Sequence, residues 1–134
     1  MVERNQDSLK TAYTITVDYK HGTTTGISAA DRSKTIQALA DPSSTEHDFN
    51  RPGHVFPLAY HEGGVEARPG HTEAGVDFCI LSGKEPCACI SEIVLDNGQM
   101  ARRNDLMMFA KRHGLKFVTI ADLIQFKKSS KPCR

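Results

Sequence analysis

Alternating side chains near the start of the chain place the first constraint on its fold. Tyr13, Ile15, Val17 and Tyr19 alternate with polar residues. Aromatic and β-branched residues at a period of two are typical of a strand with one buried face. We therefore predict a strand over residues 11–19, which needs a second layer to cover its apolar side.

Helix-capping signals predict helices that could form this second layer. Ser28 precedes Asp31 by three positions, Thr119 precedes Asp122 by three, and Gly114 follows a run that ends in basic residues; such patterns mark helix starts and stops. The predicted helices cover residues 28–40, 72–81, 104–113 and 119–126.

Further strands are predicted over two later segments, at residues 87–95 and 116–118. The first is apolar on both faces and is typical of an interior strand. Asp96-Asn97-Gly98 directly after it predicts a tight hairpin turn, whereas residues 41–54 and 59–70 are expected to be mostly loop. The class is therefore α/β (α+β), with a mixed sheet flanked by helices.

Length and charge exclude several classes of protein. The chain has 134 residues, enough for one compact domain, and its formal net charge is +1, without the basic excess of a nucleic-acid binder. It has neither an apolar run long enough for a membrane helix nor an apolar signal core, so we expect no membrane association and a cytoplasmic location. We expect a flexible N-terminus at residues 1–10, a folded domain at 11–126 and a flexible tail at 127–134.

The tetrapeptide Arg-Pro-Gly-His occurs twice, at residues 51–54 and 68–71. Arginine offers bidentate donors to a phosphate, glycine permits close backbone approach, and histidine moves protons or binds metals. The second copy runs into a predicted helix start, where free N–H groups favour an anion. These properties predict a phosphate site, with ordinary surface turns as the alternative; its residues are Arg68, Pro69, Gly70, His71 and Thr72.

Glu92 interrupts the apolar segment 87–95. A carboxylate in a buried strand is costly unless it is paired, and in a pocket it can serve acid–base chemistry. Glu92 is therefore a candidate catalytic residue, with an exposed or edge position as the alternative.

The cysteines are expected to be reduced thiols, because nothing indicates secretion; they are Cys79, Cys87, Cys89 and Cys133. Residues 71–73 followed by residues 86–89 partly match the zinc deaminase signature, His-x-Glu and then Pro-Cys-x-x-Cys. The second half is one residue short and lies in a predicted strand. Buried structural cysteines are therefore favoured over a zinc site, and metal analysis would distinguish the two.

Four ordered segments resemble one enzyme family. They read Thr24-Thr25-Gly26-Ile27-Ser28-Ala29-Ala30-Asp31-Arg32, Arg51-Pro52-Gly53-His54-Val55-Phe56-Pro57-Leu58, Gly63-Gly64-Val65 and Gly70-His71-Thr72-Glu73-Ala74. In this order and spacing they resemble 3,4-dihydroxy-2-butanone 4-phosphate synthase, the lyase of riboflavin biosynthesis. The likeness continues through Glu92 and covers most of residues 10–126.

The resemblance implies a reaction and a set of residue roles. The family converts D-ribulose 5-phosphate to 3,4-dihydroxy-2-butanone 4-phosphate and formate with a divalent metal, Mg²⁺ or Mn²⁺. It implies that His71 binds the metal, that residues 68–72 hold the substrate phosphate, and that His54 and Glu92 are catalytic residues that transfer protons. It also implies a homodimer with active sites at the subunit interface.

One departure from the family leaves a second function open. The family begins with a further stretch that includes an acidic loop of Arg-Glu-x-Glu-Gly-Asp type, and residues 1–10 do not match it. We therefore expect an N-terminally truncated form of the family's single-domain fold. Two functions are therefore possible. The chain is either the lyase or a catalytically inactive homologue that retains the fold core and the phosphate-binding segment. Two further questions are left open: whether a plastid-targeting sequence lies in the absent segment, and whether a cyclohydrolase domain follows residue 134.

Overall fold

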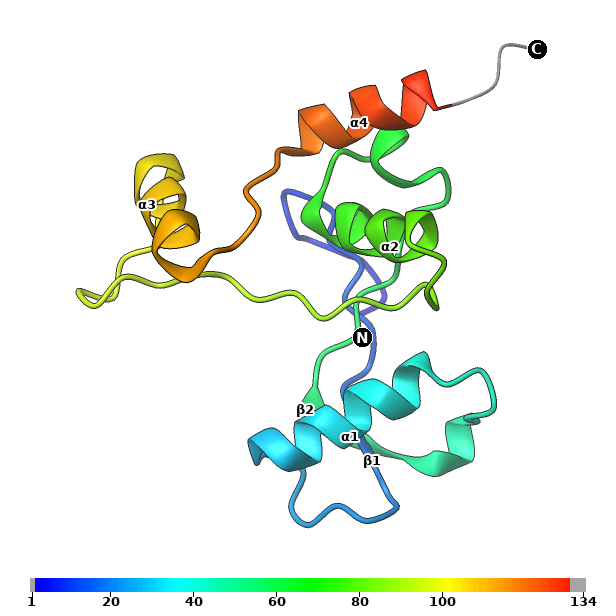
Figure 1. Ribbon diagram of the computed structural model, residues 1–134. Helices are drawn as coiled ribbons and strands as arrows, with labels where there is room; N and C mark the ends of the chain where they lie inside the picture. Colours follow the sequence, from blue (N-terminus) through cyan, green and yellow to red (C-terminus); the bar gives the residue numbers. More distant parts are fainter. Residues whose placement is uncertain (1, 131–134) are drawn as a thin grey trace.

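The computed structural model describes residues 2–130. Two short lobes and one projecting helix make up this part of the chain (Figure 1). The lower lobe contains β1 (Val17–Tyr19), α1 (Ala29–Ala40), the 3₁₀ turn η1 (Glu46–Asp48) and β2 (Phe49–Val55). The upper lobe contains the 3₁₀ turn η2 (Gly64–Glu66), α2 (His71–Leu81) and α4 (Ile120–Ser129), and α3 (Arg103–His113) extends to one side. The predicted α+β class is confirmed.

The sheet is smaller than expected and antiparallel. β1 pairs with β2 in the only sheet of residues 2–130, so the expected mixed pairing is not found there. The strand predicted over residues 11–19 is regular only at Val17–Tyr19, and β2 lies where a loop was predicted. A Cβ atom on Gly53 would collide with the β1 backbone at Val17 and Asp18. Gly53 therefore allows the two strands to approach each other closely.

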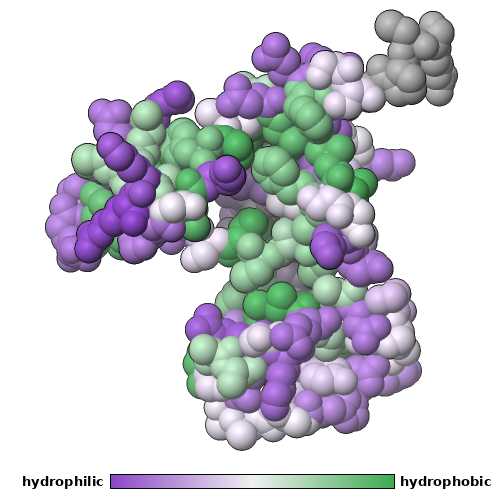
Figure 2. Space-filling view, viewed as in Figure 1, coloured by the Kyte–Doolittle hydropathy of each residue, from purple (hydrophilic) through white to green (hydrophobic). Residues whose placement is uncertain are grey.

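Each lobe has its own small apolar core. Val17, Ala38 and Phe49 form the lower one, and residues from η2, α2 and α4 form the upper one: Val65, Ala74 and Leu123. The accessible surface is 10,315 Å², whereas a compact monomer of 14.8 kDa exposes roughly 7,000 Å². The chain therefore leaves far more surface uncovered than one compact domain would. Hydrophobic surface runs through the middle of the molecule, while the lower lobe is mainly hydrophilic outside (Figure 2).

The interior strand predicted over residues 87–95 is wrong. This segment is irregular, and Ile90 and Val94 are 48% and 56% exposed. Its apolar character matches a sheet interior, but no strand in residues 2–130 pairs with it apart from a single bridge between Val94 and Met100. The tight turn after it is confirmed, because the N–H of Gly98 donates to the carbonyl of Leu95 at 2.8 Å. Residues 116–118 likewise form no strand.

Helix positions follow the local capping signals. Ser28 and Thr119 cap α1 and α4 as predicted, and Gly114 ends α3 with φ +64°. α3 begins earlier than expected, because Arg102 and not Asn104 is its N-cap. α4 continues to Ser129, so the expected tail does not begin at residue 127; residues 131–134, with Cys133, lie outside the described part. None of the helices in residues 2–130 is both long enough and apolar enough to span a bilayer.

Candidate functional site

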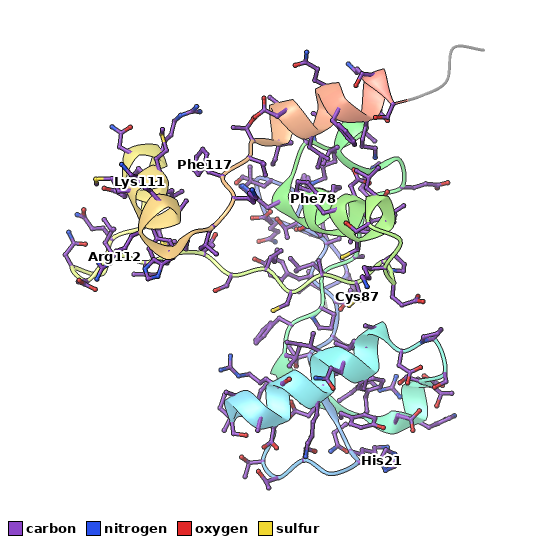
Figure 3. All side chains as sticks on the ribbon, viewed as in Figure 1. His21, Phe78, Cys87, Lys111, Arg112 and Phe117 are labelled. Atoms are coloured by element: carbon purple, nitrogen blue, oxygen red, sulfur yellow. The ribbon has the colours of Figure 1, made fainter. Side chains whose placement is uncertain are left out.

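A cleft of about 510 Å³ lies between the two lobes. His54 lines it from the end of β2 and Phe56 from the chain just after β2, Arg32 lines it from α1, and Thr72 and Val76 line it from α2. The remaining wall comes from the irregular segment, at Pro86, Cys87, Ala88, Cys89 and Ile90. Cys87 lies at the level of this cleft, between the lobes (Figure 3). Two residues predicted from separate tetrapeptide and helix signals, His54 and Thr72, therefore meet at one site.

His54 is held by a buried carboxylate. The Nδ1 atom of His54 lies 2.7 Å from Oδ2 of Asp18, and the His54 backbone N–H donates to Asp18 Oδ1 at 2.9 Å. The Asp18 side chain is 10% exposed and that of His54 is 43% exposed. A carboxylate accepts but does not donate, so Nδ1 carries the proton in this pair. Nε2 of the neutral ring is then the nitrogen that can accept a proton.

The predicted phosphate segment leads into the start of α2, with Gly70 as the N-cap. The Arg68 guanidinium donates from Nη1 to Oε2 of Glu73 at 2.6 Å and from Nη2 to the carbonyl of Leu9 at 2.9 Å. Glu73 is 1% exposed and also accepts from the His61 N–H at 3.2 Å. A Cβ atom on Gly70 would overlap this ion pair, so glycine is required for the Arg68–Glu73 contact.

Free donors at the start of α2 remain available for an anion. The N-cap residue, Gly70, has no side chain to accept from the first N–H groups of α2, and His71 and Thr72 lie in the first turn of the helix. Thr72 lines the large cleft, whereas Arg68 lines a neighbouring cavity of about 120 Å³ with Glu73 and His61. Of the predicted phosphate segment only Thr72 therefore lines the cleft, and Arg68 is paired with Glu73 in the neighbouring cavity.

Glu92 does not lie where the sequence predicted. It is exposed on the irregular segment and does not line the cleft, although Ile90 does. The exposed alternative therefore describes this residue within the single chain. The physical reason is the same as for the missing strand: without a partner strand, the segment has no interior in which to bury a carboxylate.

The cysteines and His71 form no metal cluster in residues 2–130. Within this range no group of three or more His, Cys, Asp and Glu side chains could hold an ion. Cys89 is exposed and Cys79 and Cys87 are half-buried, so the prediction of buried cysteines is wrong for Cys89. Burial raises the pKa of the Cys87 thiol, with smaller effects from Cys79 and Cys89. His71 alone is an insufficient donor set for Mg²⁺, which prefers several oxygen ligands; these residues do not fit a complete metal site.

The loop before α1 is fixed by one carboxylate. Asp31 is 4% exposed and accepts from the Thr24 hydroxyl at 2.7 Å, the Thr24 N–H at 3.2 Å and the Gly26 N–H at 3.1 Å. The Thr24 hydroxyl bond holds the pKa of Asp31 below its ordinary value, against the effect of burial. This loop packs over Asp18, since a Cβ on Gly26 would collide with the Asp18 carboxylate.

Sequence reasoning missed three residues of the site, namely Asp18, Arg32 and Glu73. Asp18 was assigned only as a polar position of a strand, and its contact with His54 spans 36 positions. Arg32 and Glu73 lie inside the segments that carried the family resemblance, which was the one signal that could have identified them.

Comparisons with known proteins agree on one family. A family model described as 3,4-dihydroxy-2-butanone 4-phosphate synthase matches residues 1–126. The chain is 57% identical over 128 residues to 3,4-dihydroxy-2-butanone 4-phosphate synthase of Agrobacterium fabrum, covering 96% of this chain and 60% of that protein. It is 55% identical over 126 residues to the bifunctional riboflavin biosynthesis protein RIBA 1, chloroplastic, of Arabidopsis thaliana, covering 94% of this chain and 23% of that one.

A solved structure supports the same relationship. A crystal structure of 3,4-dihydroxy-2-butanone 4-phosphate synthase in complex with two magnesium ions matches with a TM-score of 0.86 at 44% identity, covering 97% of this chain and 66% of that one. The described chain therefore spans part of the length of these relatives, from about a quarter to about two thirds.

Proposed function

The chain belongs to the 3,4-dihydroxy-2-butanone 4-phosphate synthase family, and from this premise we propose that it acts in the lyase reaction of riboflavin biosynthesis. The substrate is D-ribulose 5-phosphate, and the products are 3,4-dihydroxy-2-butanone 4-phosphate and formate. The observation that carries the proposal is the cleft in which the imidazole of His54 faces the same space as Thr72 of the phosphate segment.

The chemistry requires proton transfer at positioned groups. The family's reaction, as the resemblance implies it, proceeds by enolisation, loss of water, skeletal migration and expulsion of the single carbon after water adds back, and it needs no oxidant. Enolisation needs a base to remove a carbon-bound proton, and the electron pair moves into the new enediol double bond. The imidazole of His54 supplies that base within the cleft.

Phosphate binding would fix the position of the reacting carbons. The first N–H groups of α2 and the Thr72 hydroxyl are suited to a dianion, and the Arg68–Glu73 ion pair holds the segment that carries them. Holding one end of a short sugar in this way restricts its carbons to the neighbourhood of His54. Glu92 is a second proton-transfer residue in this proposal, on the strength of the family motif alone.

We further infer a divalent-metal requirement, with Mg²⁺ or Mn²⁺ as the ion. A solved relative holds two magnesium ions, and a cation of this kind would stabilise charge on an enediolate oxygen. Because residues 2–130 lack a complete donor set, His71 would contribute one nitrogen beside donors from elsewhere. Removal of metal by EDTA should stop formate release, and titration with Mg²⁺ or Mn²⁺ should restore it.

We also propose that the chain forms a homodimer. The uncovered apolar residues Phe56 and Ile90 border the cleft and are 60% and 48% exposed. The surface in excess of a compact monomer is roughly 3,000 Å², larger than a standard protein interface. Sedimentation equilibrium should give twice the mass of 14.8 kDa; a monomer mass at micromolar concentration would contradict this proposal.

The decisive experiment measures formate. The purified chain is incubated with D-ribulose 5-phosphate and Mg²⁺, and formate is quantified by a coupled dehydrogenase. The His54→Ala variant, purified in parallel, controls for formate made by contaminating host enzyme. His47→Ala is a matched control, because the His47 side chain is 84% exposed and does not line the cleft. Formate from the chain and from the His47 variant, but not from the His54 variant, supports the lyase. No formate, with retained binding of ribulose 5-phosphate in calorimetry, would favour the inactive homologue.

A further inference from the structure

Asp18 and His54 form an ion-pair contact at the edge of the cleft, where His54 is a lining residue. Both carboxylate oxygens of Asp18 accept from the same residue, Oδ1 from the His54 backbone N–H at 2.9 Å and Oδ2 from the ring at 2.7 Å. Two bonds to one residue fix the ring's position along β2 as well as its rotation.

The surroundings of Asp18 leave it little freedom to turn away. The residue is 7% exposed on β1, the loop at Gly26 packs directly over its carboxylate, and Gly53 lets β2 approach β1 at this point. The β1–β2 register is irregular between Val17 and Asp18, where the pairing partner changes from Val55 to Asn50. This irregularity brings His54, four residues beyond Asn50, beside the Asp18 side chain.

The protonation pattern of the ring follows from this geometry. An ionised carboxylate only accepts hydrogen bonds, so the proton of the neutral imidazole lies on Nδ1 and the lone pair lies on Nε2. Nδ1 faces Asp18, and His54 also lines the cleft. The nitrogen that is free to accept a proton is therefore the one that Asp18 does not contact.

We propose that Asp18 is a positioning residue for the reaction: it holds His54 as the Nδ1–H tautomer and so presents the Nε2 lone pair to the substrate. This inference rests on the proposed lyase function, in which His54 removes the carbon-bound proton. Asp18 does not line the cleft, and in this role it stabilises the imidazolium after proton transfer through the same 2.7 Å contact.

The first test reads the tautomer without any turnover. Long-range ¹H–¹⁵N NMR of the ¹⁵N-labelled wild-type chain, at about pH 8.5 and so well above the ordinary imidazole pKa, distinguishes a protonated from an unprotonated ring nitrogen. The expected result is a protonated Nδ1 and an unprotonated Nε2 at His54. Any other pattern at His54 overturns the proposal, whether or not the chain releases formate.

The second test uses the near-isosteric Asp18→Asn variant. An amide can donate to Nδ1 and so favours the opposite tautomer; kcat for formate release should fall roughly 10²- to 10⁴-fold, with KM within about twofold. Asp48→Asn is the matched control, because Asp48 also pairs with a histidine of the lower lobe, His21, at 3.2 Å. His21 lies at the far end of that lobe from Cys87 (Figure 3), and this variant should keep the wild-type kcat.

The two tests separate the possible failures. Wild-type kcat in Asp18→Asn, or a loss confined to KM, overturns the positioning role while the lyase function stands. No formate from the wild-type chain, with the expected tautomer in NMR, counts against the proposed function and supports the Asp18 geometry.

Discussion

The ion pair between Asp77 and Lys127 makes a quantitative prediction about stability. Lys127 Nζ on α4 lies 2.7 Å from Asp77 Oδ2 on α2, and the same oxygen accepts from the N–H of Val65 at 2.9 Å. The Asp77 side chain is 3% exposed, whereas that of Lys127 is 18% exposed. One carboxylate therefore joins η2, α2 and α4, the three elements of the upper core.

The two single variants should differ because only one partner can reach water. Lys127→Met leaves a buried carboxylate with the Val65 N–H and a 3.5 Å contact from the Tyr60 hydroxyl, and should cost about 3–5 kcal/mol of unfolding free energy. Asp77→Asn keeps an oxygen for the Val65 N–H and lets the ammonium turn outward, so it should cost about 1–2 kcal/mol. The double variant should resemble Asp77→Asn, so the coupling between the two changes should equal the cost of Lys127→Met alone, about 3–5 kcal/mol.

Urea unfolding followed by circular dichroism measures all four proteins. With a urea dependence of about 1–3 kcal/mol per molar, Lys127→Met should lower the midpoint by one molar or more, clearly below that of Asp77→Asn. The reasoning is refuted if Asp77→Asn is the more destabilising single change, or if the double variant is less stable than Lys127→Met. Either result would mean that the carboxylate is solvated or that α4 does not depend on it.

Three further predictions concern other parts of the chain. In a chain that releases formate, Glu92→Ala should abolish that release without changing the unfolding midpoint; retained turnover would remove Glu92 from the reaction. Because its hydrogen bonds hold the pKa of Asp31 below the ordinary value, its contribution to stability is present above pH ~4 and is lost as pH falls through the lowered pKa. Urea midpoints from pH ~7 to pH ~3 should therefore fall less for Asp31→Asn than for the wild type, and equal slopes would contradict this. Iodoacetamide at pH ~8 should modify the exposed Cys89 before Cys87, whose pKa is raised by burial; peptide mass mapping decides the order.

Local sequence signals were sufficient to predict the helices. The strand predictions were wrong where strand formation depends on pairing with a distant segment. The Ser28 and Thr119 caps act within three residues, so the sequence around each is sufficient to place α1 and α4. β2 depends instead on β1, and the segment 87–95 would need a neighbour that residues 2–130 do not provide. Composition identified an apolar segment there but could not say what would cover it.

The same distinction separates the site residues. His54 and Thr72 were found because each belongs to a short motif, and the cleft brings them together. Asp18 was not found, because an aspartate at an alternating polar position is indistinguishable from a solvated one until its partner 36 positions away is placed. Glu92 was predicted to lie in a buried strand, and this was wrong for the opposite reason. Its motif is local, but burial of its side chain depends on a partner strand from a distant part of the sequence.

The division of the apolar core into two clusters has a consequence for cooperativity. His54 belongs to the lobe built on Val17 and Phe49, and Thr72 to the lobe built on Val65 and Leu123. A sugar phosphate that contacts both residues would act as a crosslink between two lobes that have separate apolar cores. We expect the free chain to unfold in two calorimetric transitions and saturating ligand to merge them into a single, sharper one, because a ligand bound to both lobes stabilises them together.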